Sequence, residues 1–205
     1  MQPTKEAGNW EKIDILDRYI YISFAIFMYH MIQKCSIWNV FAEFAKNPTK
    51  PYHIRELSRQ INLAATSVKL HLKELEKEGL IIRVNMGVYV AYKSNFENEI
   101  FRFNKKIYNL LSIKESGIVQ ELEKQTTPDA TILFGSYSKG EDTESSDIDM
   151  FIIAKEKHLD LKAFEKKLNR KIQLFFAEDL NKIPKELLNN ILNGIILSGF
   201  VRWVK

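Results

Sequence analysis

The residues with the clearest chemical potential are two carboxylates, Asp147 and Asp149, which stand one residue apart after a polar stretch. Residues 150–153 follow them and have the apolar composition of a buried strand. Side chains two positions apart point to the same face of an extended chain, so both carboxylates are expected on one face. Two carboxylates in that arrangement can hold Mg²⁺ through their oxygens.

A second motif, Gly135 and Ser136, follows the strand-like residues 130–134. The glycine allows the backbone to approach a phosphate closely, and the Ser136 hydroxyl and nearby amides can donate to that phosphate. A magnesium ion would bridge triphosphate oxygens and offset their charge during phosphoryl transfer. A turn followed by a hydrated acidic loop is the simpler alternative, but the combination of both motifs with flanking strands favours a phosphate and metal site.

The two motifs together read G-S-x-x-x-G over residues 135–140 and S-D-x-D over residues 146–149. This pattern resembles the nucleotidyltransferase superfamily of the DNA polymerase β type, most closely its minimal (MNT-like) prokaryotic branch, over about residues 115–204. The resemblance implies Mg²⁺ and an NTP, with an acceptor hydroxyl attacking the α-phosphate and releasing pyrophosphate. It also implies roles for individual residues: Asp147 and Asp149 as catalytic metal ligands, Ser136 and Lys139 near the phosphates, and Gly135 in the turn.

The chain departs from the family at one position. The family normally supplies a third carboxylate from the next strand, expected here at residues 171–176, and the central polar residue of that strand is Gln173. An amide oxygen ligates a metal weakly and cannot accept a proton as a base. Losing a positioned base costs about 10²–10⁴ in rate. The domain is therefore slow, uses another carboxylate such as Glu178 or Asp179, or binds nucleotide without turnover.

The surrounding segments predict how these residues are positioned. Helices are expected over residues 95–111, 116–124, 161–168 and 183–192, and strands over residues 130–134, 150–153, 171–176 and 199–204. This alternation predicts a mixed α/β domain over residues 115–205, preceded by a linker helix in residues 95–114. The apolar face of that linker helix is expected to carry Phe96, Ile100, Phe103 and Ile107.

Residues 37–94 have a different pattern. Helices are expected from residue 37 to a break at residues 47–51, over residues 53–60, and over residues 64–78 before Gly79; a hairpin of residues 80–84 and 88–92 follows. Val68, Leu72 and Leu75 form the buried stripe of the third helix. The order is that of a winged helix-turn-helix, and the Leu-x-x-x-Gly-Leu-Ile element resembles winged-helix domains of prokaryotic transcription regulators. The whole chain is therefore predicted to be α+β.

A winged helix of this kind places its third helix in the major groove of double-stranded DNA. The residues predicted to contact DNA lie off the buried stripe or on the hairpin: Thr66, Ser67, Lys69, His71, Lys73 and Arg83. Leu70 stands where DNA-binding relatives usually have a polar or basic residue, and three glutamates make the second half of the helix mixed in charge. A winged helix used for packing or dimerisation is the alternative.

The charge distribution agrees with a DNA-binding module. The 205-residue chain has a net charge of +4, and residues 37–94 carry nine of its basic and five of its acidic residues, which accounts for the whole excess. The lone cysteine, Cys35, excludes an internal disulfide framework and a multi-cysteine zinc site, and suits a cytoplasmic protein.

The first segment, residues 1–36, contains a stretch at residues 19–33 without Asp, Glu, Lys or Arg. As a helix this stretch would reach roughly 22 Å, short of a hydrocarbon core of about 30 Å, so no membrane insertion is expected. It is predicted to be a helix that packs on the next domain or on a second copy in a homodimer. Met28 and Met31 precede the first domain, so residues 1–27 could also precede the natural start.

Two functions follow from these features. The first is a Mg²⁺-dependent nucleotidyltransferase coupled to a DNA-binding winged helix. The second is a weak or inactive nucleotidyltransferase-like domain that senses NTP or binds a partner, within a transcription regulator or antitoxin. Minimal members of the family often pair with a small helical protein, frequently as antitoxins that nucleotidylate it, so the resemblance implies such a partner.

Overall fold

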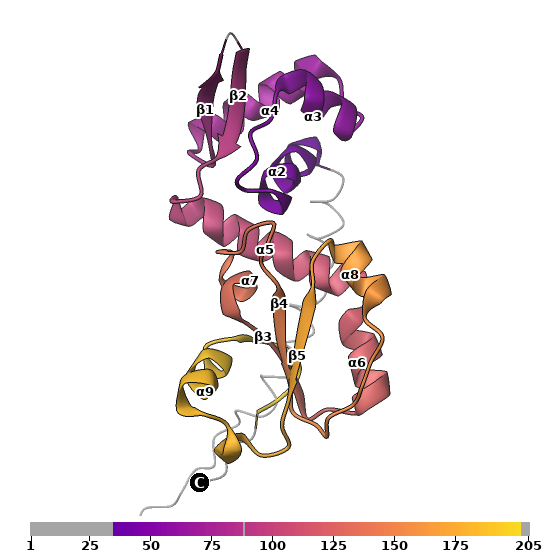
Figure 1. Ribbon diagram of the computed structural model, residues 1–205. Coiled ribbons are helices and arrows are strands. Elements are labelled where there is room, and N and C mark those ends of the chain that lie inside the picture. Colours follow the sequence, from indigo (N-terminus) through magenta and orange to yellow (C-terminus); the bar gives the residue numbers. More distant parts are fainter. Residues whose placement is uncertain (1–34, 88, 202–205) are drawn as a thin grey trace, which may run out of the picture.

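The computed structural model describes residues 35–87 and 89–201, in two parts joined by the long helix α5 (Figure 1). The helix expected over residues 19–33 lies outside this described part. Within it, no helix is both long and apolar enough to cross a membrane.

The first part has the element order of a winged helix-turn-helix, as predicted: α2 (Ser36–Lys46), α3 (Ile54–Gln60), α4 (Ala65–Lys77), β1 (Ile81–Met86) and β2 (Tyr89–Ser94). The two strands form an antiparallel hairpin in which Ile81 pairs with Ser94, and Met86 with Tyr89. Each strand extends two residues beyond its predicted end because the pairing continues along the wing. Tyr52, before α3, adds a bridge to Tyr92.

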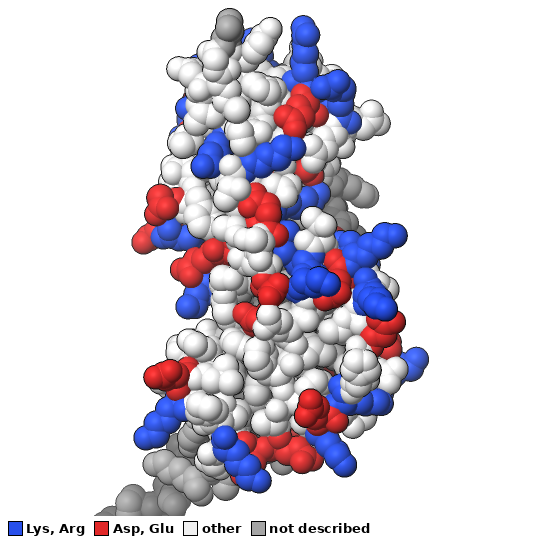
Figure 2. Space-filling model, viewed as in Figure 1, with Lys and Arg blue, Asp and Glu red and all other residues white. Residues whose placement is uncertain are grey.

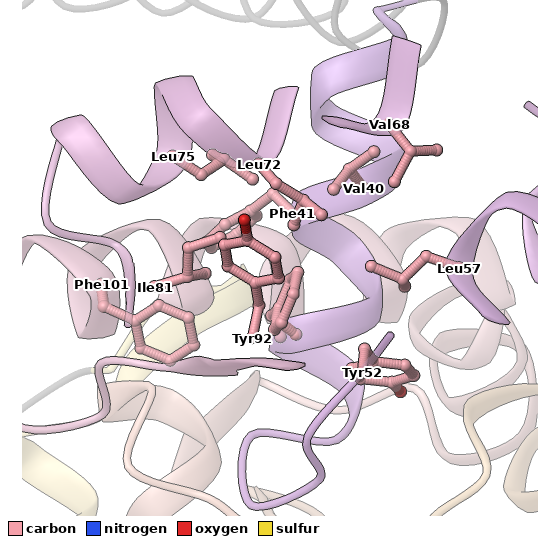
Figure 3. Packing of buried hydrophobic residues seen from close by; sticks show 12 residues of the cluster. Val40, Phe41, Tyr52, Leu57, Val68, Leu72, Leu75, Ile81, Tyr92 and Phe101 are labelled. Atoms are coloured by element: carbon pink, nitrogen blue, oxygen red, sulfur yellow. The ribbon is translucent and has the colours of Figure 1, made fainter. Parts of the chain in front are cut away.

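The core of this part is formed by the apolar faces that the sequence pattern predicts (Figure 3). Val68, Leu72 and Leu75 of α4 pack on α2, where Val40 and Phe44 are fully buried. Phe101, the third residue of α5, completes the same cluster. The first turn of α5 therefore belongs to the core of the winged helix.

Helix α5 (Glu99–Ser116) begins at Asn98, whose side chain caps the amides of Ile100 and Phe101, and α6 (Ile118–Thr126) follows it. The prediction for its buried face was wrong. Ile100 and Phe103 are 58% and 63% exposed, whereas the buried stripe runs through Phe101, Lys105, Asn109 and Ile113. Two polar residues lie inside because the second part of the molecule provides partners for them.

The second part is built on a four-stranded sheet with the order β5-β4-β3-β6, formed by β3 (Ala130–Phe134), β4 (Ile148–Ile152), β5 (Ile172–Phe176) and β6 (Ile195–Gly199). Strand β4 is parallel to β5, and β3 is antiparallel to β4 and β6. Four helical segments connect the strands: α7 (Gly135–Lys139), α8 (Lys162–Leu168), the 3-10 turn η1 (Leu180–Lys182) and α9 (Lys185–Leu192).

Helices cover both faces of this sheet (Figure 1). Side chains of α5, α6 and α8 pack on the face that carries Ile148, Met150 and Ile152, and α9 packs on the face that carries Phe134 and Phe151. The last strand begins at Ile195, earlier than the expected residue 199, and ends at Gly199, after which Phe200 still donates its amide to the Asp129 carbonyl; residues 202–204 of the expected strand lie outside the described residues. The whole is an α+β fold, as predicted.

Candidate functional site

The acidic pair lies at the start of the central strand β4. Asp149 is the second residue of β4, and Asp147 is the residue just before the strand. In the sheet register Asp149 lies between Phe134 of β3 and Gln173 of β5. The Gln173 Nε2 atom donates to the Asp147 Oδ2 atom at 2.5 Å. Asp147, Asp149 and Gln173 are therefore brought together on one face of the sheet, as the sequence predicted for the two carboxylates.

Gly135 lies directly against the carboxylate of Asp149. Its φ angle is +73°, and a Cβ atom added to it would lie 2.5 Å from the Asp149 Oδ2 atom. A side chain at position 135 would therefore both strain the backbone and fill the space beside the carboxylate. This contact joins the glycine motif to the acidic pair, which are separated in sequence.

Ser136 and Lys139 lie on the short helix α7, where the sequence had suggested only a turn. Ser136 is half-buried, and its hydroxyl makes no hydrogen bond within residues 35–87 and 89–201. Lys139 is exposed. Sequence reasoning missed Ser138, a buried residue whose hydroxyl donates to the Gly135 carbonyl at 2.8 Å. Ser138 thus holds the turn that leaves Ser136 available for a ligand.

The electrostatics of the pair fit a cation. Burial, and then the negative charge of Asp147, raise the pKa of Asp149 above its ordinary value. A divalent cation between the two carboxylates would relieve both effects, and the donors are oxygens of the kind that Mg²⁺ prefers. Among the described residues no group of three His, Cys, Asp or Glu side chains gathers as a metal site.

The other carboxylates considered from the sequence do not reach this site. Strand β5 continues to Phe176, which pairs with Ile152 at the far end of β4. Glu178 is five residues beyond Gln173, roughly 16 Å along an extended chain. Asp179 accepts hydrogen bonds from the backbone and side chain of Asn181. Gln173 therefore occupies the third position without a substitute from these two residues.

A groove of about 510 Å³ opens beside Asp147. It runs between the loop before β4 and helix α8, and its lining includes Lys162, Lys166 and Lys171. Figure 2 shows the positive side chains gathered beside α8. The same lining includes Glu144 and Glu165, and Lys171 pairs with Glu165 at 3.6 Å, so the groove beside Asp147 is mixed in charge.

The predicted DNA-contacting residues divide into two groups on the winged helix. Thr66, Lys69 and Lys73 are exposed on one side of α4, and Ser67 is half-buried next to them. His71 instead shares a 2.7 Å hydrogen bond between its Nε2 atom and the hydroxyl of Ser36 on α2.

Arg83 of β1 is also engaged within the domain. It forms a 3.0 Å ion pair with Glu76 and lies over the ring of Tyr92. Thr66, Lys69 and Lys73 are therefore more accessible to a ligand than His71 and Arg83, whose side chains are engaged within the domain.

Two large apolar side chains of the winged helix are also exposed. Leu70 of α4 is 66% exposed, next to Lys69, and Tyr89 at the tip of the wing is 73% exposed. The sequence singled out Leu70 as a departure and gave no signal for Tyr89, because strand alternation does not identify which wing residues face solvent. An apolar side chain on a groove-reading helix can contact a thymine methyl group.

Comparison with known families agrees with this architecture. Residues 116–199 match the model described as polymerase beta, nucleotidyltransferase, and residues 51–82 match the model described as winged helix-turn-helix DNA-binding. The chain thus combines a winged helix-turn-helix DNA-binding domain with a nucleotidyltransferase domain of the polymerase β family.

Other comparisons are more distant. A search of curated proteins found no match. Among solved structures, the crystal structure of NadR in complex with 4-hydroxyphenylacetate is similar with a TM-score of 0.36 and 18% identity, over 60% of this chain and 89% of that chain.

Proposed function

We propose that the protein is a Mg²⁺-dependent nucleotidyltransferase that transfers NMP from an NTP to an acceptor hydroxyl, and that its winged helix binds double-stranded DNA. The observation that carries the proposal is the contact between the two motifs. The Asp149 carboxylate packs directly against Gly135, so a phosphate bound at the turn that Gly135 begins would lie next to the acidic pair.

Each residue of the site would have a distinct role in this reaction. Asp147 and Asp149 would hold Mg²⁺, which when bound offsets negative charge on the phosphates. The unpaired hydroxyl of Ser136 would donate to a phosphate oxygen, and the exposed Lys139 would add positive charge. Gln173 would orient Asp147 through its amide but could not take the proton of the acceptor. The expected chemistry is therefore slow.

The test is label transfer from α-³²P NTP with Mg²⁺, comparing the wild-type protein with Asp147→Asn. Label that appears on an acceptor with the wild type and is absent with the variant would support the proposal. Tight NTP binding without transfer to any acceptor, together with no release of pyrophosphate, would exclude the enzymatic function.

That second outcome would favour the alternative, a catalytically inactive domain that senses NTP or binds a partner within a transcription regulator or antitoxin. Gln173 is the observation that favours it, because the residue in register with Asp149 has no proton-accepting group. An NTP that changes DNA affinity without being consumed would distinguish the sensor from the enzyme.

The partners expected from the sequence are part of the same proposal. A small helical partner protein and a homodimer stay predictions, and the dimer surface expected at residues 19–33 lies outside the described residues. Co-purification from the native source and the mass of the purified protein in solution would test them.

A further inference from the structure

A buried ion pair lies outside the acidic site but within the loop that carries it. Asp142 is fully buried between Gly140 and Asp147, in the connection from α7 to β4. Its two carboxylate oxygens each lie 2.7 Å from the Lys105 Nζ atom, and Lys105 is also fully buried. The pair has no contact with solvent, so its function is not to provide surface charge.

Further polar groups complete this cluster. The amide of Asn109 donates to Asp142 at 2.7 Å and to the Tyr137 carbonyl at 2.9 Å. The guanidinium of Arg170 lies 3.9 Å from Asp142 and donates to the carbonyl of Lys46 at the end of α2. One carboxylate in the loop is thus contacted from the linker helix and from the segment that leads into β5.

Helix α5 connects this cluster to the winged helix. Lys105 and Asn109 are one helical turn apart on its buried stripe, and Phe101, one turn earlier, lies in the core of the winged helix. Gly140 lies against the backbone of α5, where an added Cβ atom would be 2.9 Å from the Lys106 amide nitrogen. The start of the loop is therefore fixed against a helix that is itself fixed at its other end.

A separate contact holds the middle of the loop. Glu144 accepts two hydrogen bonds of 3.0 Å from Thr49, one from its amide and one from its hydroxyl. The hydroxyl of Ser146 accepts from the Thr143 amide at 2.9 Å. Asp147 follows directly, so few residues separate each anchor from the carboxylate of the site.

Burying this ion pair is costly. Burial lowers the pKa of Lys105, and the charge of Asp142 opposes that change. Apolar residues of similar volume often stabilise a protein as well as a buried ion pair does, whereas removing one charge leaves the other unpaired. An ion pair fixes the relative position of the two segments that carry it, here α5 and the loop, more narrowly than apolar packing does, because its hydrogen bonds are directional.

We propose that Asp142 is a positioning residue for the acidic site: its contacts with Lys105, Asn109 and Arg170 fix the loop of residues 140–147 and thereby place Asp147 beside Asp149 and Gln173. This inference rests on the proposed function for its cation, but the position of the loop can be measured without one.

The test compares Asp142→Asn with the wild-type protein. The asparagine keeps the shape and the contact with Asn109 but removes the charge. Mn²⁺, which prefers the same oxygen ligands as Mg²⁺, is titrated and followed by its paramagnetic resonance signal. We expect the Kd of Mn²⁺ to rise about tenfold, the usual effect of losing a residue that orients a metal ligand.

The matched control is Glu43→Gln. Glu43 is a buried carboxylate of α2 whose side chain pairs with Lys46 at 2.6 Å and accepts from Gln60 of α3, rather than from any residue of the loop. This variant should lose stability without changing the Mn²⁺ affinity. An equal rise in Kd for both variants, or no rise for Asp142→Asn, would overturn the proposal.

Hydrogen exchange of the metal-free protein separates this inference from the proposed function. Amides of residues 143–148 should exchange about tenfold faster in Asp142→Asn, with little change in α3 and α4. If the wild-type protein binds no Mn²⁺, the proposed function fails and the exchange rates alone decide the positioning role. Unchanged exchange would refute it.

A second variant covers the case in which Asp142→Asn does not fold. Glu144→Ala removes the contact with Thr49 but leaves the buried pair of Asp142 and Lys105 in place, so it should fold. We expect faster exchange of Ser145 and Ser146 and a smaller rise in the Kd of Mn²⁺ than for Asp142→Asn. Exchange at the wild-type rate would show that the contacts around this loop do not fix it.

Discussion

Asp149 of β4 lies opposite Gln173 of β5 in the parallel register, and the amide of Gln173 donates to Asp147. One neutral side chain thus bonds to Asp147 and lies in register with Asp149, at the position where the family resemblance implies a third carboxylate. The amide adds no negative charge and accepts no proton. This arrangement keeps the geometry of the site while limiting its attraction for a cation and its capacity for base catalysis.

Gln173→Glu should therefore increase activity. The variant places a carboxylate in register with Asp149, where it can help hold Mg²⁺ and accept the proton of the acceptor. We expect pyrophosphate release from an NTP to rise by about 10²-fold or more, the usual contribution of a positioned base. The rate is measured with saturating Mg²⁺, because three carboxylates repel one another without a cation.

Gln173→Met is the matched control, since it removes the hydrogen bond to Asp147 without adding a proton acceptor. It should release pyrophosphate no faster than the wild type. A glutamate variant that is no faster than the methionine variant would show that the missing base does not limit this site.

Much of the site could be predicted because its determinants are local. Residues 130–134 form β3 as expected, and the central polar position of the next parallel strand identified Gln173 before the register was known. The stripe of Val68, Leu72 and Leu75 likewise gave the packing of α4, because apolar periodicity and burial agree there.

The buried face of α5 could not be predicted because its determinants are not local. Periodicity assigns Ile100 and Phe103 to the core, yet Lys105 and Asn109 are buried because Asp142 pairs with both. A pairing between residues more than thirty positions apart leaves no signal in a local pattern.

Gly135→Ala should abolish cation binding at the acidic pair. The alanine would adopt a φ angle near +73° at a cost of about 1–2 kcal/mol. Its Cβ atom would also displace the Asp149 carboxylate, which lies 2.5 Å from that position. The Kd of Mn²⁺ and the free energy of unfolding should both change.

Gly117→Ala separates these two effects. Gly117 has a φ angle of +82°, but an added Cβ atom meets no atom within 4 Å. This control should lose a similar amount of stability through backbone strain and keep the wild-type Kd for Mn²⁺. Equal losses of Mn²⁺ affinity in both variants would contradict a specific role for Gly135.

Asp149→Asn should stabilise the protein in the absence of metal near neutral pH. Because the pKa of Asp149 is raised in the folded state, folding binds protons, and its contribution to stability falls as the pH rises from the ordinary aspartate range through that raised pKa. Asparagine removes this penalty, so the Tm of the variant should exceed that of the wild type at pH 7.

The difference in Tm should shrink as the pH falls below the ordinary aspartate pKa of about 3.9, where the wild-type carboxyl is protonated in both states. Thermal unfolding in a metal-chelating buffer across this pH range provides the measurement. Added Mg²⁺ should reverse the order of stability at pH 7, since only the wild type can gain from binding it. A Tm difference independent of pH would exclude this carboxyl as its cause.

Lys69→Ala combined with Lys73→Ala should weaken binding to double-stranded DNA and reduce its dependence on salt. Both lysines are exposed on α4, and neither forms an ion pair among the described residues. Each contact with a phosphate contributes about 0.9 to the slope of log K against log salt concentration, so the slope should fall by about two. Lys182→Ala with Lys185→Ala removes the same charge from exposed positions around α9 and should leave the slope unchanged. If both pairs reduce the slope equally, the effect reports net charge, and α4 is not the surface that contacts DNA.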